Sequence, residues 1–185
     1  QEGHIEIVKY LIEEIGVNVN YADKEGWTAC LLAADQGHFR IVNYLISEKG
    51  VDANDAEDTG VTACLLATRQ GHANIVKYLT EKKDVDVNYP DKDGWTASFY
   101  AAHFGQIDIL QYFIEKHRVD ANYANDDGLT ACLIATGQGH SHIVRYLLEN
   151  HRVDVNYPDK KGWTACLYAA HYGHIDILQY FIEKH

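Results

Sequence analysis

The chain has 185 residues, of which 46% are hydrophobic and 23% are charged, a composition typical of a folded soluble protein. Its formal net charge of -11 at pH 7 opposes the electrostatic attraction that dominates nucleic-acid binding, and it disfavours binding to an anionic membrane surface. We therefore expect a protein partner that is neutral or basic, no nucleic acid and no membrane insertion. Because neither a membrane-spanning run nor a signal peptide is visible, we expect a cytoplasmic or otherwise intracellular protein.

Two series of glycines recur with one constant 34-residue period, which predicts a repeat protein. The first series begins a G-x-T-A phrase and comprises Gly26, Gly60, Gly94, Gly128 and Gly162. The second is followed by histidine everywhere except at Gln106, and comprises Gly3, Gly37, Gly71, Gly105, Gly139 and Gly173. We expect one solenoid domain over 1–185, with a partial repeat at 1–22 and repeats at 23–56, 57–90, 91–124, 125–158 and 159–185. The chain has no methionine, not even at position 1, so we expect the natural protein to be longer.

Each period predicts two short helices followed by a turn-forming segment. In the first complete period Thr28 caps the first helix and Gly37 ends it. A second helix follows, because the apolar residues of the next segment fall on one helical face. This face carries Ile41, Val42, Leu45 and Ile46. Isolated helices shorter than about 12 to 15 residues are marginal in water, so stacking of helix pairs must supply the stability.

The phrase G-x-T-A-C-L-x-A-A-x-x-G-H, followed by I-V-x-Y-L and V-D-V-N, resembles the ankyrin repeat over essentially the whole chain. The resemblance implies an all-α fold, an ankyrin-type solenoid of stacked helix-turn-helix repeats with projecting turn or hairpin loops. It also implies a structural role for the histidine of the G-H phrase. Two departures are visible: TACL or TASF replaces the family's TPLH, and each period has one extra residue near the end of the second helix. Leucine or phenylalanine therefore replaces the family's histidine, and we expect a more apolar junction between repeats.

A second period, twice as long, lies above the first. Residues 94–117 and 162–185 are identical at 20 of 24 positions. Recent tandem copying without functional content explains this similarity. Alternatively, alternate repeats present the same contact twice to a partner.

The cysteines do not predict a disulfide or a metal site. Four of them stand at one position of the repeat, as Cys30, Cys64, Cys132 and Cys166, and Ser98 takes the remaining place. Stacked helices lie about 8 to 10 Å apart, whereas a disulfide needs Cα atoms within about 7 Å and zinc needs four converging ligands. We expect small buried core residues instead. Because no nucleophile, phosphate-loop, zinc-protease or EF-hand motif is present, we also expect no catalytic residue, no cofactor and no enzyme.

The resemblance implies where a partner binds, because turn tips and exposed first-helix positions line the concave groove of an ankyrin stack. These positions flank the first glycine of each period or precede the second. The candidate partner-binding residues are Trp27, Asp35, Gln36, Arg69, Gln70, Lys92, Asp93, Trp95, His103, Phe104, Leu129, Lys160, Lys161, Trp163, His171 and Tyr172.

All three tryptophans fall at one turn position, alternating with Val61 and Leu129. Tryptophan is enriched at binding hot spots, because a large rigid ring gains much on burial. The alternative is that each ring lies flat on the neighbouring turn and stiffens the edge. For the His-Phe and His-Tyr pairs before the second glycine of two periods we favour binding, and histidines in an interface make affinity sensitive near pH 6.5.

Three functions fit these observations. The first is a non-catalytic scaffold that binds a protein partner through the groove and turn tips. The second is an architectural or self-assembling solenoid with end-to-end self-association, because the last helix matches internal repeats and no polar capping repeat follows. Its apolar residues are Ile177, Leu178, Phe181 and Ile182. The third is the targeting arm of a larger enzyme, channel or effector.

Overall fold

The chain folds into short α-helices joined by turns in a computed structural model, which describes residues 2–83 and 85–184, and side chains from residue 4 onward within these ranges. The helices are α1 (Glu2–Glu13), α2 (Ala29–Asp35), α3 (Phe39–Ser47), α4 (Ala63–Gln70), α5 (Ala73–Lys82), α6 (Ala97–His103), α7 (Ile107–His117), α8 (Ala131–Gly137), α9 (Ser141–His151), α10 (Ala165–Tyr172) and α11 (Ile175–Lys184). Strand-like pairing in these ranges is limited to isolated bridges joining Ala22 to Thr28, Ala56 to Thr62 and Ala124 to Thr130. The predicted all-α repeat fold is confirmed.

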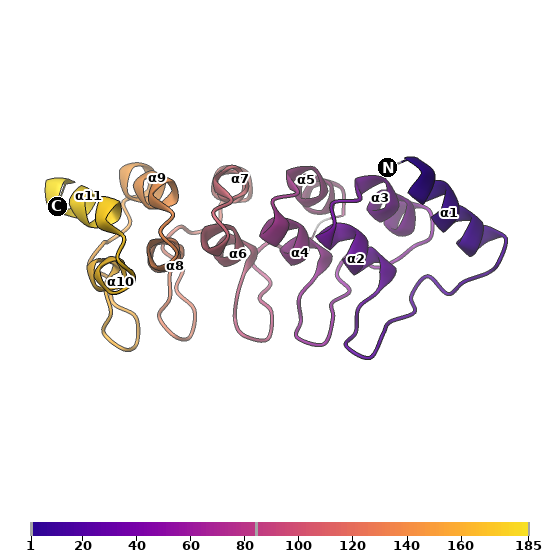
Figure 1. The fold of residues 1–185 in the computed structure, drawn as a ribbon, viewed down its shortest axis with the longest axis horizontal. Coiled ribbons are helices and arrows are strands. Elements are labelled where there is room, and N and C mark those ends of the chain that lie inside the picture. The colour runs from indigo at the N-terminus through magenta and orange to yellow at the C-terminus, as the bar shows by residue number, and fades with distance from the viewer. Residues whose placement is uncertain (1, 84, 185) are drawn as a thin grey trace. The chain divides into compact units, whose positions relative to one another are not determined.

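The helices form two compact units, Gln1–Asp93 and Gly94–His185. In the first unit α2 and α4 form one row, while α1, α3 and α5 form a second row (Figure 1). In the second unit α6, α8 and α10 form one row, and α7, α9 and α11 form the other. Hairpin turns project beyond the first-helix row of each unit, as Figure 1 shows. Each first helix therefore packs on its neighbour in the row and on the second helix of its own repeat.

The first helices begin at the threonine of the G-x-T-A phrase. The Oγ1 atoms of Thr28, Thr62 and Thr130 accept the N–H three residues later at 3.3, 3.4 and 3.3 Å, which satisfies a donor that the helix itself leaves unpaired. Thr96 and Thr164 make no such bond, and the hydroxyl of Thr96 lies 2.9 Å from the hydroxyl of Ser98. The capping role predicted for Thr28 is confirmed.

The second glycine series leaves room for the histidine of the next repeat. Gly139 has φ +78, and a Cβ placed on it would lie 2.6 Å from Cε1 of His174. Nε2 of this histidine lies 3.0 Å from the carbonyl oxygen of Gly137 and donates to it, because a carbonyl only accepts. The same joint pairs Gly37 with His72 and Gly105 with His140. These contacts give the G-H histidine the structural role that the resemblance implied.

The first glycine series lets successive turns approach backbone to backbone. Gly26 has φ +83, and a Cβ on it would lie 2.8 Å from the backbone nitrogen of Asp58. That N–H donates to the carbonyl of Glu25 at 3.1 Å. In the second unit, the N–H of Lys160 donates to the carbonyl of Asp127 at 2.9 Å in the same way. Adjacent hairpin tips are thus tied by main-chain hydrogen bonds that do not depend on side-chain identity.

The cysteine position lies in the core of the internal repeats. Cys30, Cys64 and Cys132 are buried as predicted, and burial raises the pKa of each thiol to about 12. The prediction is wrong for Cys166, which is exposed. Within the described residues no helix packs on that side of α10, so the neighbouring Leu167 is also 50% exposed. The apolar junction expected at the leucine position is present at the internal repeats, where the side chains are buried: Leu31, Leu65, Phe99 and Leu133.

One residue of the period takes a left-handed backbone conformation just after the second helix. It is Gly50 with φ 71 after α3, and Arg118 and Arg152 with φ 54 and 51 after α7 and α9. The next N–H then reaches back six residues, as from Val119 to the carbonyl of Phe113 at 3.2 Å. Glycine adopts this conformation without steric cost, whereas an L side chain loses about 1–2 kcal/mol there.

Candidate functional site

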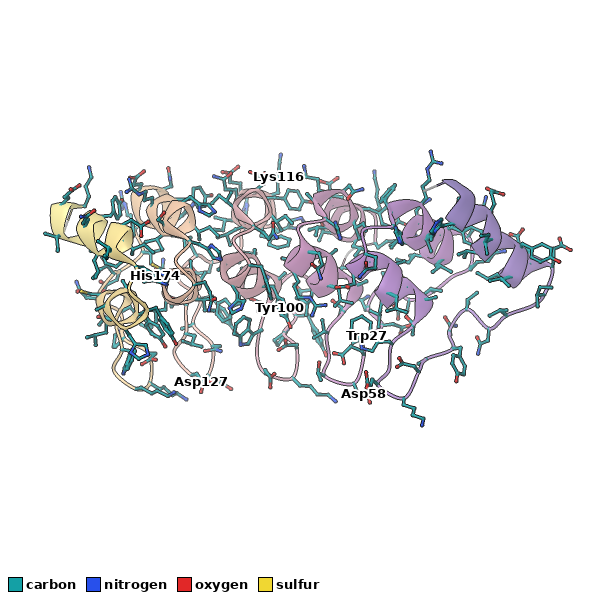
Figure 2. All side chains as sticks on the ribbon, in the orientation of Figure 1. Trp27, Asp58, Tyr100, Lys116, Asp127 and His174 are labelled. Atoms are coloured by element: carbon teal, nitrogen blue, oxygen red, sulfur yellow. The ribbon has the colours of Figure 1, made fainter. Side chains whose placement is uncertain are left out.

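Two clusters of aromatic rings stand at matching positions of the second unit. Each cluster takes one tryptophan from a turn and three rings from the first helix that follows, or from the residue directly after it. Cluster A consists of Trp95, Tyr100, His103 and Phe104, and cluster B consists of Trp163, Tyr168, His171 and Tyr172. The label on Tyr100 in Figure 2 marks the first cluster on α6.

Cluster A is held by edge-on and stacked ring contacts. The ring centroid of Trp95 lies 5.7 Å from that of Tyr100 and 5.2 Å from that of His103, both edge-on. Tyr100 stacks on Phe104 at 6.3 Å, and His103 meets Phe104 at 4.6 Å. The tryptophan therefore packs against the first helix of its own repeat and does not lie flat on a neighbouring turn.

Cluster B repeats this geometry almost ring for ring. Trp163 lies 5.4 Å from Tyr168 and 5.0 Å from His171, both edge-on. Tyr168 stacks on Tyr172 at 6.4 Å, and His171 meets Tyr172 at 4.7 Å. Edge-to-face and offset pairs of this kind are favourable by about 0.5–1.5 kcal/mol beyond their burial. Each cluster is therefore a preformed aromatic surface.

The outermost ring of each cluster faces solvent. Phe104 is 42% exposed and Tyr172 is 55% exposed, whereas the two tryptophans and the two tyrosines beneath them are half-buried. Large exposed aromatic side chains that are already ordered lose little entropy when a partner covers them. Phe104 and Tyr172 are therefore open to a partner, whereas His103 is half-buried.

A buried carboxylate positions cluster B. Oδ1 of Asp159 accepts the N–H groups of Lys161 and Trp163 at 2.9 and 2.8 Å, and Oδ2 accepts the hydroxyl of Tyr168 at 2.8 Å. Burial raises the pKa of Asp159, but these hydrogen bonds outweigh it and the net pKa lies below the usual value. Burial and the adjacent carboxylate raise the pKa of Tyr168 to about 12. The turn, the tryptophan and the tyrosine are thereby fixed as one piece.

The helix between the clusters is small and uncharged. An added Cβ on Gly137 of α8 would lie 3.3 Å from Cδ1 of Tyr168 and 3.8 Å from Cε2 of Tyr172, so cluster B leans over this glycine. None of α6, α8 and α10 contains Asp, Glu, Lys or Arg. The first-helix row of the second unit therefore presents aromatic and neutral polar groups and no side chain with a permanent charge.

Sequence reasoning missed three members of this site, Tyr100, Tyr168 and Asp159. The two tyrosines are separated by the same double-repeat interval as the histidine-aromatic pairs, and each stands five residues after a tryptophan. That spacing was the available signal. Nothing in the sequence indicated that Asp159 is buried under the turn.

Four predicted residues of the first unit form a polar network instead of an aromatic cluster: Asp35, Gln36, Arg69 and Gln70. Oδ1 of Asp35 accepts Nη2 of Arg69 at 2.7 Å and Nε2 of Gln70 at 2.9 Å, and Oδ2 accepts Nε2 of Gln36 at 2.9 Å. Burial raises the pKa of Asp35, but the hydrogen bonds from Gln70 and Arg69 outweigh this and keep it below the usual value. These four residues tie α2 to α4, so their binding capacity is partly used within the repeat stack.

The remaining predicted residues lie in turns. Trp27 is half-buried in the first unit, where Figure 2 labels it, and its repeat has Leu32 at the position of Tyr168. Leu129 is half-buried, and its N–H donates to Oδ1 of Asn125 at 3.0 Å. The turn-tip residues Lys92, Asp93, Lys160 and Lys161 are exposed.

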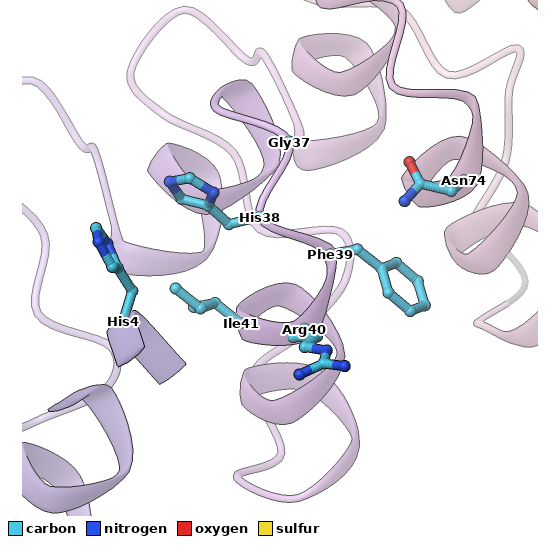
Figure 3. Close-up of a pocket in the computed structure, with 7 residues that line it drawn as sticks. All are labelled: His4, Gly37, His38, Phe39, Arg40, Ile41 and Asn74. Atoms are coloured by element: carbon cyan, nitrogen blue, oxygen red, sulfur yellow. The ribbon is translucent and has the colours of Figure 1, made fainter. Parts of the chain in front are cut away.

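A hollow of about 350 Å³ lies in the first unit, as Figure 3 shows. It is lined by His4, Gly37, His38, Phe39, Arg40, Ile41 and Asn74. The two imidazole centroids are 6.2 Å apart. The lining contains no thiol, hydroxyl or carboxylate side chain, and no group of three potential metal ligands occurs among the described residues. The hollow therefore lacks the nucleophile and carboxylate of a hydrolytic site.

These features define a stacked helical-repeat protein. Its short helices form two rows in each unit, its hairpin tips are hydrogen-bonded, and a glycine and a histidine join successive repeats. The first helices and the turns form its exposed surface. A family model described as ankyrin repeats (3 copies) matches residues 1–57, 32–125 and 117–185. The chain belongs to the ankyrin repeat family, whose members are generally non-catalytic modules for protein–protein interaction. No curated protein matches the sequence. In the described ranges, no helix has both the length and the apolar character needed to span a bilayer.

Proposed function

We propose that the protein is a non-catalytic scaffold that binds a protein partner through the aromatic face of its second unit. The observation that carries this proposal is the duplication of one ring arrangement at clusters A and B, with Phe104 and Tyr172 exposed. A stabilising role requires neither an exposed outer ring nor its repetition two repeats later. The division into the repeats at 23–56, 57–90, 91–124, 125–158 and 159–185 remains a prediction, as does an intracellular location, which free thiols favour.

The protein itself supplies the substitutions that test this proposal. At the positions of Tyr168, His171 and Tyr172, the first complete repeat has Leu32, Asp35 and Gln36. The triple variant Tyr168→Leu, His171→Asp, Tyr172→Gln therefore replaces cluster B with residues that this fold already accommodates. We name it the swap variant.

The test is affinity capture with the wild-type chain and the swap variant as bait, read by quantitative mass spectrometry. We expect a partner that the wild type captures and the swap variant loses, since removal of a central aromatic anchor typically weakens binding by about 2 kcal/mol or more. Circular dichroism and thermal melting check that the variant is folded. Equal capture by both baits contradicts the proposal.

Lys116→Ala is the matched control. Lys116 is exposed on α7 and projects from the second-helix row, on the other side of its unit from the turn tip that carries Asp127 (Figure 2). We expect this variant to capture the same partner as the wild type. Loss of the partner here would mean that general charge, and not the aromatic face, drives capture.

A second candidate function is end-to-end self-association, which exposed apolar side chains on terminal helices favour. Ile182 is 80% exposed and Ile175 is 66% exposed on α11, while Ile7 and Tyr10 are exposed on α1. Of the side chains predicted to form this end, Ile177 and Phe181 are buried within their own repeat, so they are unsuitable for a surface test. Ile175→Glu with Ile182→Lys is therefore the appropriate variant, and sedimentation equilibrium should show a concentration-dependent oligomer in the wild type that this variant abolishes.

A further inference from the structure

The first-helix row of the second unit excludes charged ligands from its centre. Because α6, α8 and α10 carry no Asp, Glu, Lys or Arg, a charge buried against them would have no ionic partner. Burial of an unpaired charge is strongly unfavourable. Charge complementarity therefore selects an uncharged segment, although the chain as a whole is acidic with a formal net charge of -11.

The spacing of the row distinguishes between ligand conformations. Packed helices lie about 8–10 Å apart, so a ligand running along the row meets a new first helix at this interval. A polyproline II helix turns once every three residues and rises about 9.3 Å per turn, so it presents the same face to each helix. A β-strand covers this interval in about three residues and then presents its opposite face, while an α-helix needs about six residues and turns its anchor away.

The surface chemistry matches such a ligand. Aromatic grooves bind proline-rich segments because flat proline rings pack on aromatic faces and the extended ligand is already ordered. The backbone carbonyls of polyproline II are unpaired and need donors. Within the described residues, the hydrogen bond that Trp163 donates comes from its backbone N–H, to Asp159, so its indole N–H can donate to a ligand.

We infer that the ligand of this face is an uncharged, proline-rich segment in the polyproline II conformation, which runs along α6, α8 and α10 and contacts cluster A and cluster B two turns apart. Its anchoring side chains recur every third residue, and the outer two lie six residues apart. The inference rests on the proposed function and adds the class of ligand to it. Gly137 has no side chain, so the surface of α8 is recessed beside cluster B, and the middle anchor of the ligand contacts α8 between the two clusters.

The test uses synthetic peptides with blocked ends. The in-phase peptide repeats Pro-Pro-Leu three times, and the out-of-phase peptide has the same composition with its leucines four residues apart. A third peptide of Ala, Gln and Leu is uncharged and forms an amphipathic helix. Each is titrated by isothermal calorimetry into the wild-type chain, the swap variant and Lys116→Ala.

We expect the in-phase peptide to bind the wild type about tenfold or more tightly than either other peptide. The swap variant should weaken its binding about tenfold or more, and Lys116→Ala should leave it unchanged. Equal binding of the in-phase and out-of-phase peptides, or tighter binding of the helical peptide, overturns the inference.

The outcomes separate the inference from the proposed function. If the swap variant loses its captured partner but no proline-rich peptide binds the wild type, the ligand class is wrong and the scaffold proposal stands. If capture and peptide binding are both indifferent to the swap, both proposals fail.

Discussion

Replacing Arg118 or Arg152 by glycine is expected to stabilise the protein. These two arginines end α7 and α9 with φ 54 and 51, in the left-handed region. The corresponding residue after α3 is Gly50, with φ 71. The backbone geometry is therefore a property of the repeat, and arginine occupies a position that suits glycine.

The magnitude follows from two opposing terms. A left-handed conformation costs an L residue about 1–2 kcal/mol. Glycine also has more conformational freedom in the unfolded chain, and this freedom lowers the free energy of unfolding by about 0.5–1 kcal/mol. Each substitution should therefore add about 0.5–1 kcal/mol to the free energy of unfolding, and both together about 1–2 kcal/mol if they are additive. Because both side chains are exposed, little packing is lost.

The assay is equilibrium unfolding in urea, with thermal melting as a second measurement. For a chain of this size 1 kcal/mol shifts Tm by about 2–4 °C, so the double variant should melt about 2–8 °C higher. Arg118→Ala and Arg152→Ala are the controls, because alanine removes the side chain but keeps the Cβ that clashes. These controls should unfold near the wild-type midpoint.

The reverse substitution checks the same reasoning. A Cβ on Gly50 would meet nothing within 4 Å, so Gly50→Ala introduces backbone strain without a collision. It should lower the free energy of unfolding by about 0.5–1 kcal/mol, because the strain is partly offset by the smaller freedom of alanine in the unfolded chain. If the glycine and alanine variants at 118 and 152 are equally stable, backbone strain at these positions is not the cause and the reasoning is refuted.

Two further predictions concern the joints and the carboxylate of the second unit. Gly139→Ala should destabilise the protein by more than Gly173→Ala, because a Cβ on Gly139 meets the ring of His174. Gly173 has φ +78 and open space around it, so Gly173→Ala measures in urea unfolding the net cost of the left-handed conformation, about 0.5–1 kcal/mol. A double variant with His174→Ala should recover part of the difference, and no recovery would exclude the collision. Asp159→Ala should cost about 1–3 kcal/mol by leaving buried donors unpaired, whereas Asp159→Asn should cost less, since Asn125 holds the preceding turn. The pKa of Asp159 is lowered in the folded protein, so its carboxylate adds stability at pH values above about 3.9, the pKa of the unfolded carboxyl. This stability is lost as the pH falls through the pKa of the folded state. Between pH 5 and 2, the free energy of unfolding should therefore decline less steeply for Asp159→Asn than for the wild type.

The repeat period made most of the fold predictable. A phrase such as G-x-T-A sets a cap, a helix start and a turn together, so Thr28 and the helices around it followed from the sequence. Cys166 did not follow, because its burial depends on whether another repeat packs on α10 and not on its own neighbours in the chain. The left-handed conformation of Arg118 did not follow either, because arginine does not signal a positive φ.

The candidate site was only half visible in the sequence. Turn and helix-end positions could be read from the family pattern, which identified Trp163 and Tyr172. Tyr168 completes this cluster because its hydroxyl donates a hydrogen bond to Asp159, nine residues earlier. Whether two residues at this separation meet depends on the path of the turn between them, which the sequence does not show. In the first unit, Asp35 and Arg69 occupy the corresponding positions and form an ion pair with each other. The residue type at a single position does not reveal such a contact between repeats.

The histidine joints bear on how the length of this array can change. Gly37 meets His72 and Gly139 meets His174 with the same geometry, and the hairpin tips pair through main-chain atoms. Recombination that adds or removes whole repeats would thus form the same contact between a glycine and the histidine of the next repeat, and no new interface would be needed. A gain or loss of repeats in pairs would also preserve the alternation of aromatic and small first helices. The binding surface could thus become longer or shorter while the order of its side-chain types stays the same.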